Sequence, residues 1–230
     1  MSLSNNNKQI FIFLGAPGSG KGTLSYLCVE KLGWKQLSTG DLCRKHIAER
    51  TLLGAEIDLA IKSGTLVADS VIIDMVDQWL EQEKKLDVSI ILDGFPRTVS
   101  QAEGFVRLIQ DKFPFMPLRI VRFIISDETV IKRLGSRLIC SNKNCQRVYS
   151  MDTHGDFSPK IAMHCDDCNF KLIVRDDDKP EAIKTRLAAY KYHVGALVDF
   201  YEKSGFEIAD IDAEGTSESI FNNFLDMIEQ

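Results

Sequence analysis

No uninterrupted apolar run in the sequence reaches the roughly 18 to 20 residues that a membrane-spanning helix needs. The polar segment 1–7 also lacks the basic and apolar stretches of a secretory signal peptide. We therefore expect a soluble, cytoplasmic protein with no membrane partner. In that compartment its six cysteines would not normally form disulfides, so any clustering among them needs another explanation.

The sequence also lacks a long basic block, and its formal net charge is −5. Because binding to a phosphate backbone depends on clustered lysine and arginine, this charge balance argues against nucleic acid as the main partner. Internal repeats and low-complexity linkers are absent apart from an Asn-rich start. A chain of 230 residues can form one well-buried core that carries inserted segments, which is the organisation we expect.

A glycine-rich segment directly after an apolar run is the most informative feature that is present. Residues 9–14 (QIFIFL) predict a strand, and residues 15–23 (GAPGSGKGT) predict a phosphate-binding loop that opens a helix. Backbone N–H groups of such a loop surround phosphates, Lys21 adds a point charge, and the helix offers its positive end. The pattern departs from G-x-x-x-x-G-K-[ST] because Gly22 takes the hydroxyl position, and Thr23, which would reach Mg²⁺, follows one residue later.

Strand and helix patterns alternate along most of the remaining chain. The expected strands cover residues 9–14, 34–37, 88–92, 119–125 and 206–211, and the expected helices cover residues 24–32, 40–63 with a break at Gly54, 69–85, 100–111, 127–134, 181–201 and 217–228. Asp178 and Glu181 have the spacing of a capping box at the start of one helix. This order predicts an α/β fold, a P-loop three-layer sandwich around a parallel sheet.

A second group of candidate binding residues follows the apolar run 88–92. Residues 93–97 (DGFPR) would lie at the carboxyl end of that strand, where open parallel sheets bind ligands, and would share a crevice with the glycine-rich loop. Asp93 can orient Mg²⁺ or its waters, Gly94 permits close backbone approach, and Arg97 can contact a second phosphate in a bidentate manner. The alternative is an ordinary turn with a surface arginine.

The pattern changes between residues 136 and 178, where cysteine, aspartate and asparagine interrupt the alternation and predict a small β-rich insert. Its two cysteine pairs are Cys140 with Cys145 and Cys165 with Cys168. Four thiolates suit a closed tetrahedral Zn²⁺ site that stabilises a segment too small for its own core. Free thiols, His164 as a substitute ligand, Fe²⁺ or Co²⁺ in place of zinc, and an empty site are the alternatives.

Several separated segments, taken in order, resemble the adenylate kinase family. The matching segments are residues 15–23, 38–44 (STGDLCR), 92–98 (LDGFPRT) followed by Gln101, 175–178 (RDDD) and 186–187 (RL). The similarity extends from about residue 10 to residue 224. Two features depart from the family pattern: Ser136 precedes Arg137 where glycine is common, and the first cysteine pair is stretched to C-x-x-x-x-C.

The resemblance implies a reversible, Mg²⁺-dependent phosphoryl transfer in which ATP and AMP give two ADP, an activity that serves adenine nucleotide homeostasis. The residues implied to bind ATP are Gly18, Ser19, Gly20, Lys21, Gly22, Thr23, Arg137, Val148, Tyr149 and Gly215. Those implied to bind AMP are Thr39, Arg44, Thr65, Leu66, Val67, Gly94, Phe95, Pro96, Arg97, Gln101, Arg175 and Arg186. The catalytic cations implied are Lys21, Arg97, Arg133, Arg137, Arg175 and Arg186, with Asp93 holding Mg²⁺ through water.

The same resemblance divides the chain into three parts. They are a core P-loop domain (residues 1–37, 68–135 and 179–230), a helical AMP-binding insert (38–67) and a lid insert (136–178) held by structural Zn²⁺. Both inserts would close over the substrates and exclude water from the transfer. The expected ligands are ATP, AMP and ADP, with Mg²⁺ bound to ATP, and the expected oligomeric state is a monomer.

Two other functions stay open on the sequence. A kinase for another nucleoside monophosphate would carry similar motifs, although Thr39 and Gln101 favour adenine by resemblance and the long lid argues against short-lidded pyrimidine kinases. A nucleic-acid remodelling protein would use the cysteine segment as a zinc ribbon. Against this function, the segment carries the acidic residues Asp166, Asp167 and 176–178, which would repel the phosphates of a nucleic acid.

Overall fold

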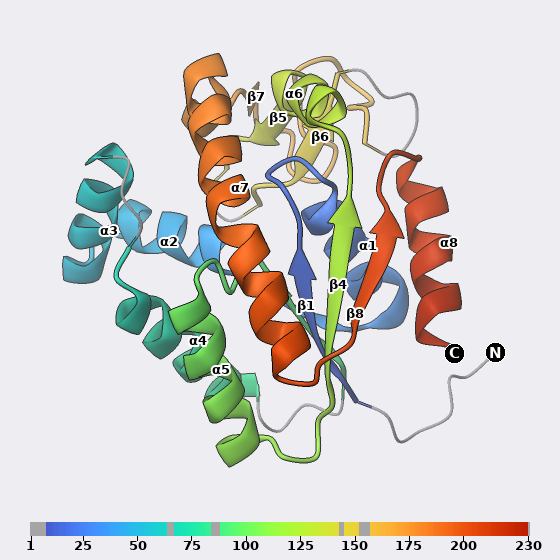
Figure 1. Cartoon of the computed structure of the whole chain (residues 1–230). Coiled ribbons are helices and arrows are strands. Elements are labelled where there is room, and N and C mark those ends of the chain that lie inside the picture. The colour runs from blue at the N-terminus through green and yellow to red at the C-terminus, as the bar shows by residue number, and fades with distance from the viewer. Residues whose placement is uncertain (1–7, 64–66, 84–87, 143–144, 152–156, 230) are drawn as a thin grey trace.

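The computed structural model describes residues 8–63, 67–83, 88–142, 145–151 and 157–229. Its centre is a five-stranded parallel sheet in the order β2-β3-β1-β4-β8 (Figure 1). These strands are β1 (Ile10–Leu14), β2 (Lys35–Ser38), β3 (Ile90–Asp93), β4 (Leu118–Ile124) and β8 (Ile208–Asp212). The parallel sheet confirms the predicted α/β fold class.

Helices surround this sheet. They are α1 (Lys21–Leu32), α2 (Thr39–Ala48), α3 (Leu52–Ser63), α4 (Asp69–Glu83), α5 (Val99–Lys112), α6 (Asp127–Gly135), α7 (Pro180–Lys203) and α8 (Ser217–Ile228). Among the described residues, no helix is long and apolar enough to span a membrane.

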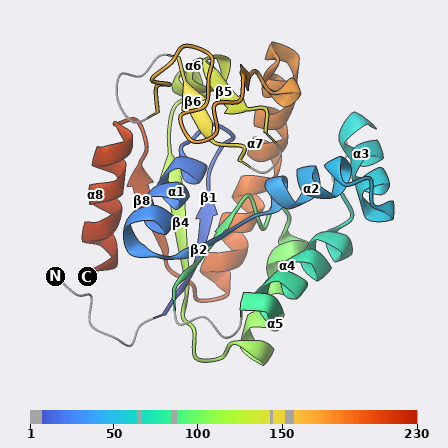
Figure 2. The same ribbon diagram turned by 180° about the vertical axis from the view of Figure 1, so that it is seen from behind.

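Successive residues of β1 face opposite sides of the sheet, as strand geometry requires, and enter two separate cores. Ile10, Ile12 and Leu14 belong to the core that includes residues of α4, α5 and α7, the side seen in Figure 1. Phe11 and Phe13 belong to the core that includes residues of α1 and α8, the side seen in Figure 2. Helices therefore cover both faces, which confirms the three-layer sandwich.

The predicted break in the helix over residues 40–63 lies at the wrong place. The chain leaves α2 after Ala48, Arg50 has a left-handed φ of 53°, and α3 begins at Leu52. Gly54 lies inside α3, and a Cβ at this position would be only 2.1 Å from the carbonyl oxygen of His46. Gly54 therefore permits close packing of α3 on α2 and does not end a helix.

The predicted capping box at the start of α7 is also wrong. The N-cap of α7 is Lys179, which makes no side-chain cap bond, and Pro180 occupies the first turn, where its missing N–H costs nothing. Asp178 lies before the helix in the short 3₁₀ helix η1 (Asp176–Asp178). Its carboxylate binds two arginines, as described below, and is not used for capping.

A second, smaller sheet lies above the carboxyl ends of the parallel strands in Figure 1. It is antiparallel, with the order β6-β5-β7, and consists of β5 (Arg137–Cys140), β6 (Val148–Ser150) and β7 (Leu172–Ile173). Leu138, Tyr149 and Leu172 are buried in its own small cluster, together with Cys140 and Cys165. The β-rich character predicted for this segment is confirmed, and part of its interior is cysteine.

Candidate active site

Three segments leave the parallel sheet side by side at its carboxyl edge. Phe13 of β1 and Ser38 of β2 are both in register with Asp93 of β3. The glycine-rich loop after β1, the start of α2 after β2 and the segment after β3 are therefore neighbours. In the sheet, β1 lies between β3 and β4, so the order of the strands reverses direction at β1. Open α/β sheets bind ligands at the carboxyl end of such a topological switch point.

The glycine-rich loop is closed by the side chain of Lys21. Its Nζ donates to the carbonyl oxygens of Gly15 and Ala16, both at 2.8 Å, and to Oγ of Ser19 at 3.3 Å. Gly18 and Gly20 have φ angles of 80° and 96°, a backbone region that glycine enters without strain. The loop therefore has a fixed shape with an ammonium group held at its centre.

Asp93 lies against the first turn of α1. A Cβ on Gly22 would lie 3.3 Å from Oδ2 of Asp93, so glycine at the hydroxyl position leaves room for the carboxylate. Burial raises the pKa of Asp93, opposed by the nearby Lys21. Burial also lowers the pKa of Lys21 to about 8, opposed by Asp93 and reinforced by Arg97. Both groups are thus poorly solvated, an arrangement that a bound ion of opposite charge would stabilise.

Thr39 and Arg97 converge on the carbonyl group of Gly94. The Gly94 oxygen accepts the hydroxyl of Thr39 at 3.0 Å and Nε–H of Arg97 at 2.8 Å. The following peptide, Phe95–Pro96, is cis, and Phe95 is buried against the ring of Phe105. Burial lowers the pKa of Arg97, and the charge of Arg186 lowers it further. The start of α2 and the end of β3 therefore meet at the Gly94 carbonyl group, beside the guanidinium of Arg97.

The carboxylate of Asp178 joins two of the predicted arginines. Arg137 donates to it through Nε at 2.7 Å and Nη2 at 2.5 Å, and Arg186 donates through Nη1 at 3.1 Å. Arg186 also donates to the carbonyl oxygen of Asp177 at 2.8 Å. The Asp178 side chain is completely buried. Sequence reasoning missed this role, and the acidic run beside Arg175 was the signal that could have indicated it.

Arg44 and Arg175 each carry a buried donor that has no hydrogen-bond partner among the described residues. Arg44 forms an ion pair with Asp41, yet its Nε is buried without a hydrogen-bond acceptor, as is Nε of Arg175. Burial lowers the pKa of Arg175 to about 10, and the charges of Arg44 and Arg137 act in the same direction. Buried N–H donors on crowded cations suit phosphate or carboxylate binding.

Arg133 lies between the glycine-rich loop and the segment before α8. Its Nη2 donates to the carbonyl oxygen of Gly215 at 3.0 Å, and its Nη1 would be 3.7 Å from a Cβ on Gly20. Burial lowers the pKa of Arg133. Three predicted residues from distant parts of the sequence are therefore neighbours.

The side chain of Tyr149 points into the small sheet's own cluster. It is 1% exposed, and its hydroxyl accepts the N–H of Asp166 at 2.7 Å. A ligand can therefore meet Tyr149 only through its main chain. Of the remaining predicted residues, Val67 packs against the larger core, whereas Thr65 and Leu66 lie outside the described residues.

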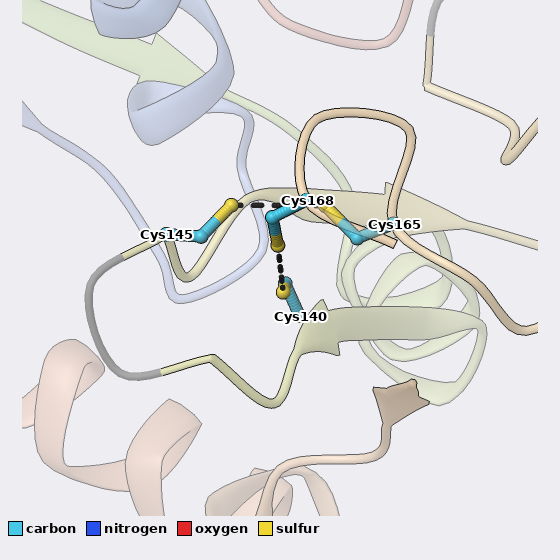
Figure 3. A group of neighbouring side chains, drawn as sticks. All are labelled: Cys140, Cys145, Cys165 and Cys168. Carbon is cyan, nitrogen blue, oxygen red and sulfur yellow. Dashed lines mark hydrogen bonds between the residues drawn. The ribbon is translucent and has the colours of Figure 1, made fainter. Parts of the chain in front are cut away.

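The predicted metal ligands form a compact cluster (Figure 3). The Sγ atoms of Cys140 and Cys168 are 3.3 Å apart, and those of Cys145 and Cys165 are 3.6 Å apart. All four sulfurs lie within 4.8 Å of one another. Sulfurs bound at ~2.3 Å to one tetrahedral Zn²⁺ are ~3.8 Å apart, so this spacing fits such an ion.

The neighbourhood of the cluster resolves two sequence questions. The N–H of Cys145 donates to the carbonyl oxygen of Asn142 at 3.0 Å, and both cysteines of the first pair reach the cluster despite their longer spacing. Nδ1 of His164 lies 2.9 Å from the carbonyl oxygen of Ala162, and within the described part of the chain the ligand group contains cysteines only. The alternative with His164 as a ligand is therefore not supported.

Comparisons with known proteins extend over the same segments. A family model described as adenylate kinase matches residues 13–206. An adenylate kinase of Borrelia garinii is 42% identical over 193 residues, which cover 84% of this chain and 85% of that protein. Adenylate kinases of Treponema denticola and Thermodesulfovibrio yellowstonii are each 39% identical, over 93% and 95% of this chain and 96% and 98% of their own lengths. The chain, with its glycine-rich loop, its cations at the carboxyl edge and its four-cysteine sheet, belongs to the adenylate kinase family of phosphotransferases.

Proposed function

We propose that the chain transfers the terminal phosphoryl group of MgATP to AMP, reversibly, to give two ADP. The gathering of cationic side chains at the carboxyl edge carries this proposal. The charges of Arg97 and Arg186 both act to lower the pKa of Lys21, and that of Arg186 also acts to lower the pKa of Arg97, although the three residues come from three separate segments. Because phosphoryl transfer joins two polyanions and needs little covalent help, positioned positive charge is the main requirement.

The donor nucleotide would occupy the glycine-rich loop. The residues proposed to hold its phosphates are Gly18, Ser19, Gly20, Lys21, Gly22 and Thr23. The main chain of Gly215, and Val148 with the main chain of Tyr149, would meet the adenosine part, whereas Arg133 would add positive charge beside the phosphates. Asp93 offers the oxygen ligands that Mg²⁺ prefers, through water, and the bound ion would neutralise charge on the phosphates.

The acceptor would lie between α2 and the segment after β3. The residues proposed for AMP are Thr39, Arg44, Thr65, Leu66, Val67, Gly94, Phe95, Pro96, Arg97 and Gln101. Two observations support an acceptor phosphate here: Nε of Arg44 has no hydrogen-bond partner among the described residues, and the guanidinium of Arg97 lies at the Gly94 carbonyl group. Other nucleoside monophosphates are the nearest alternative acceptors.

The reacting phosphates would meet Arg137, Arg175 and Arg186. These guanidiniums stabilise charge on the transferred group and keep the two substrates in line, and losing one such contact costs about 10³-fold in rate in related transfers. Asp178 would orient Arg137 and Arg186 without touching substrate. No general base is required, and His46 and His193 have no role in the proposal.

The small antiparallel sheet would act as the lid. We propose the division into a core (1–37, 68–135 and 179–230), an AMP-binding insert (38–67) and a lid (136–178), with structural Zn²⁺ bound by the four cysteines. A closed set of four thiolates leaves no open coordination position, so the metal would stabilise the lid and take no part in the reaction. A cytoplasmic monomer that acts on ATP, AMP and ADP completes the proposal.

The test follows ADP formation from MgATP with AMP, GMP, CMP and UMP in turn. We expect rapid turnover with AMP alone. Arg97→Ala should reduce the rate by about 10³-fold, whereas Arg107→Ala, which changes an exposed arginine of α5, the helix that follows Arg97, should leave it unchanged. Absence of ADP with every acceptor would refute the function, and full activity of Arg97→Ala would refute the site.

A further inference from the structure

Asp69, the first residue of α4, binds the side chain of Gln101. Nε2 of Gln101 donates to Oδ1 of Asp69 at 2.8 Å, and Oε1 accepts the backbone N–H of Arg97 at 2.8 Å. The hydroxyl of Thr98 donates to Oδ2 of Asp69 at 2.8 Å. Thr98 is also the N-cap of α5, where it accepts the N–H of Gln101 at 3.1 Å. Gln101 is 3% exposed, so little water competes for these bonds.

The partners of Gln101 dictate which way its amide points. The two ends of an amide have nearly the same shape, so polarity must be argued from the hydrogen-bond partners. The Asp69 carboxylate accepts and cannot donate, whereas the N–H of Arg97 donates and cannot accept. A turn of the amide by 180° would place oxygen against carboxylate and NH₂ against N–H. Both bonds would be lost, and two contacts of like polarity would replace them.

Among the described residues, the network leaves half of the amide's hydrogen-bonding capacity unused. A primary amide has two N–H donors and two acceptor lone pairs, and the network uses one of each. The remaining donor and acceptor match the edge of adenine, which offers a donor at N6 and an acceptor at N1. Purines with a 6-oxo group, such as hypoxanthine and guanine, offer the reverse pair: an acceptor at O6 and a donor at N1. They would require the turned amide.

We propose that Asp69 is a positioning residue which fixes the polarity of the Gln101 amide and thereby selects a 6-aminopurine monophosphate over 6-oxopurine monophosphates as acceptor. The proposal rests on the proposed function, in which Gln101 meets the acceptor base. The location of Gln101 supports a contact with the acceptor base. Its side chain accepts the backbone N–H of Arg97, and the Arg97 side chain and the Thr39 hydroxyl both donate to the carbonyl oxygen of Gly94. A site that holds its polar groups in one polarity rejects the opposite pattern strongly.

The test replaces Asp69 with asparagine and compares AMP with inosine monophosphate, which differs from AMP at the base edge and lacks the 2-amino group of GMP. An asparagine amide can donate as well as accept, so one of the two constraints on Gln101 disappears while the shape stays similar. We expect the ratio of kcat/KM for inosine monophosphate to that for AMP to rise about tenfold, with the KM for MgATP unchanged. Asp69→Glu retains an acceptor-only group and should keep the ratio of the unmodified chain.

The matched control is Glu128→Gln, an exposed acid in the first turn of α6, which removes the same charge from a helix start. Its ratio and its KM for AMP should not change. A lower melting temperature of Asp69→Asn with an unchanged ratio would mean that Asp69 is structural, and this would overturn the inference alone. If the unmodified chain formed no ADP from AMP, the proposed function and the inference would fail together.

Discussion

Replacing Asp178 with asparagine tests whether a buried carboxylate organises the arginines of the site. The change keeps the size of the side chain but removes the charge that accepts three N–H bonds from Arg137 and Arg186. The Asp178 side chain is 0% exposed, and those of Arg137 and Arg186 are 17% and 30% exposed. Water can therefore replace little of what is lost.

The expected loss of stability follows from these burials. Removing one partner of a buried ion pair costs about 3–5 kcal/mol when the remaining charge has no other partner. Because asparagine retains one acceptor and Arg186 is partly solvated, we expect about 2–3 kcal/mol. For a chain of this length such a loss corresponds to a decrease in Tm of about 5–10 °C. The matched control is Asp176→Asn in the same acidic run, whose side chain is 98% exposed, and its Tm should not change.

The assay combines thermal and urea unfolding with steady-state kinetics. Bound phosphates would supply the negative charge that Asp178→Asn lacks, and this offsets the cost of ordering its arginines, so MgATP and AMP should raise the Tm of this variant about as much as that of the unmodified chain. Its kcat should fall at least about tenfold, because two arginines lose their orientation. A Tm equal to that of Asp176→Asn would refute the structural reasoning. A low Tm with full kcat would show that the two arginines do not act on the transferred group.

Three further predictions address the loop, the metal and the helical pair. The pKa of Lys21 is about 8 in the folded chain and ordinarily 10.5, so folding releases its proton between these pH values and the stability from this group rises with pH there. A bound phosphate favours the charged form of Lys21, so nucleotide affinity should fall by up to about tenfold per pH unit above pH 8. Calorimetry in this pH range should show that the protein takes up a proton when nucleotide binds, and pH-independent binding would contradict this. Cys165→Ser should lose the bound metal and melt lower, and unchanged metal content by elemental analysis would rule out a structural ion. Gly54→Ala would place a Cβ 2.1 Å from the His46 carbonyl oxygen and should raise the KM for AMP more than that for MgATP, whereas Gly195→Ala, with nothing within 4 Å, should be neutral or stabilising; equal kinetics of the two variants would contradict this.

The sequence predicts the sheet and the loop well because their signals are local. Residues 9–23 contain both the strand and the glycines that turn the loop, and each later strand is a short apolar run. The helix boundary near Arg50 was missed because no glycine or proline marks it, although the backbone turns there with a φ of 53°. Gly54 suggests a helix break that does not occur, because this glycine is required for close packing of α3 on α2.

The partners of the charged side chains could not be predicted from the sequence, because they depend on tertiary contacts. Arg137 and Asp178 are 41 positions apart, and Asp69 and Gln101 are 32 positions apart. The spacing of Asp178 and Glu181 fits a capping box, but bonds to two guanidiniums use the same carboxylate. The family resemblance predicts which arginines belong to the site, whereas only the fold shows which carboxylate accepts hydrogen bonds from Arg137 and Arg186.

The carboxylates of the site have an effect that its net charge alone does not predict. Removing a carboxylate makes the site more positive, and Coulomb attraction alone would then predict tighter phosphate binding and faster transfer. Asp178 instead lies between two cations that repel each other, and it fixes their long side chains before a substrate arrives. Ordering such a side chain costs up to about 2 kcal/mol of conformational entropy, which would otherwise be lost during binding. In Asp178→Asn the greater positive charge opposes this cost in binding but does not restore the orientation of the arginines. The variant should therefore bind phosphate with little loss and transfer it slowly, so affinity and rate should separate in a single variant.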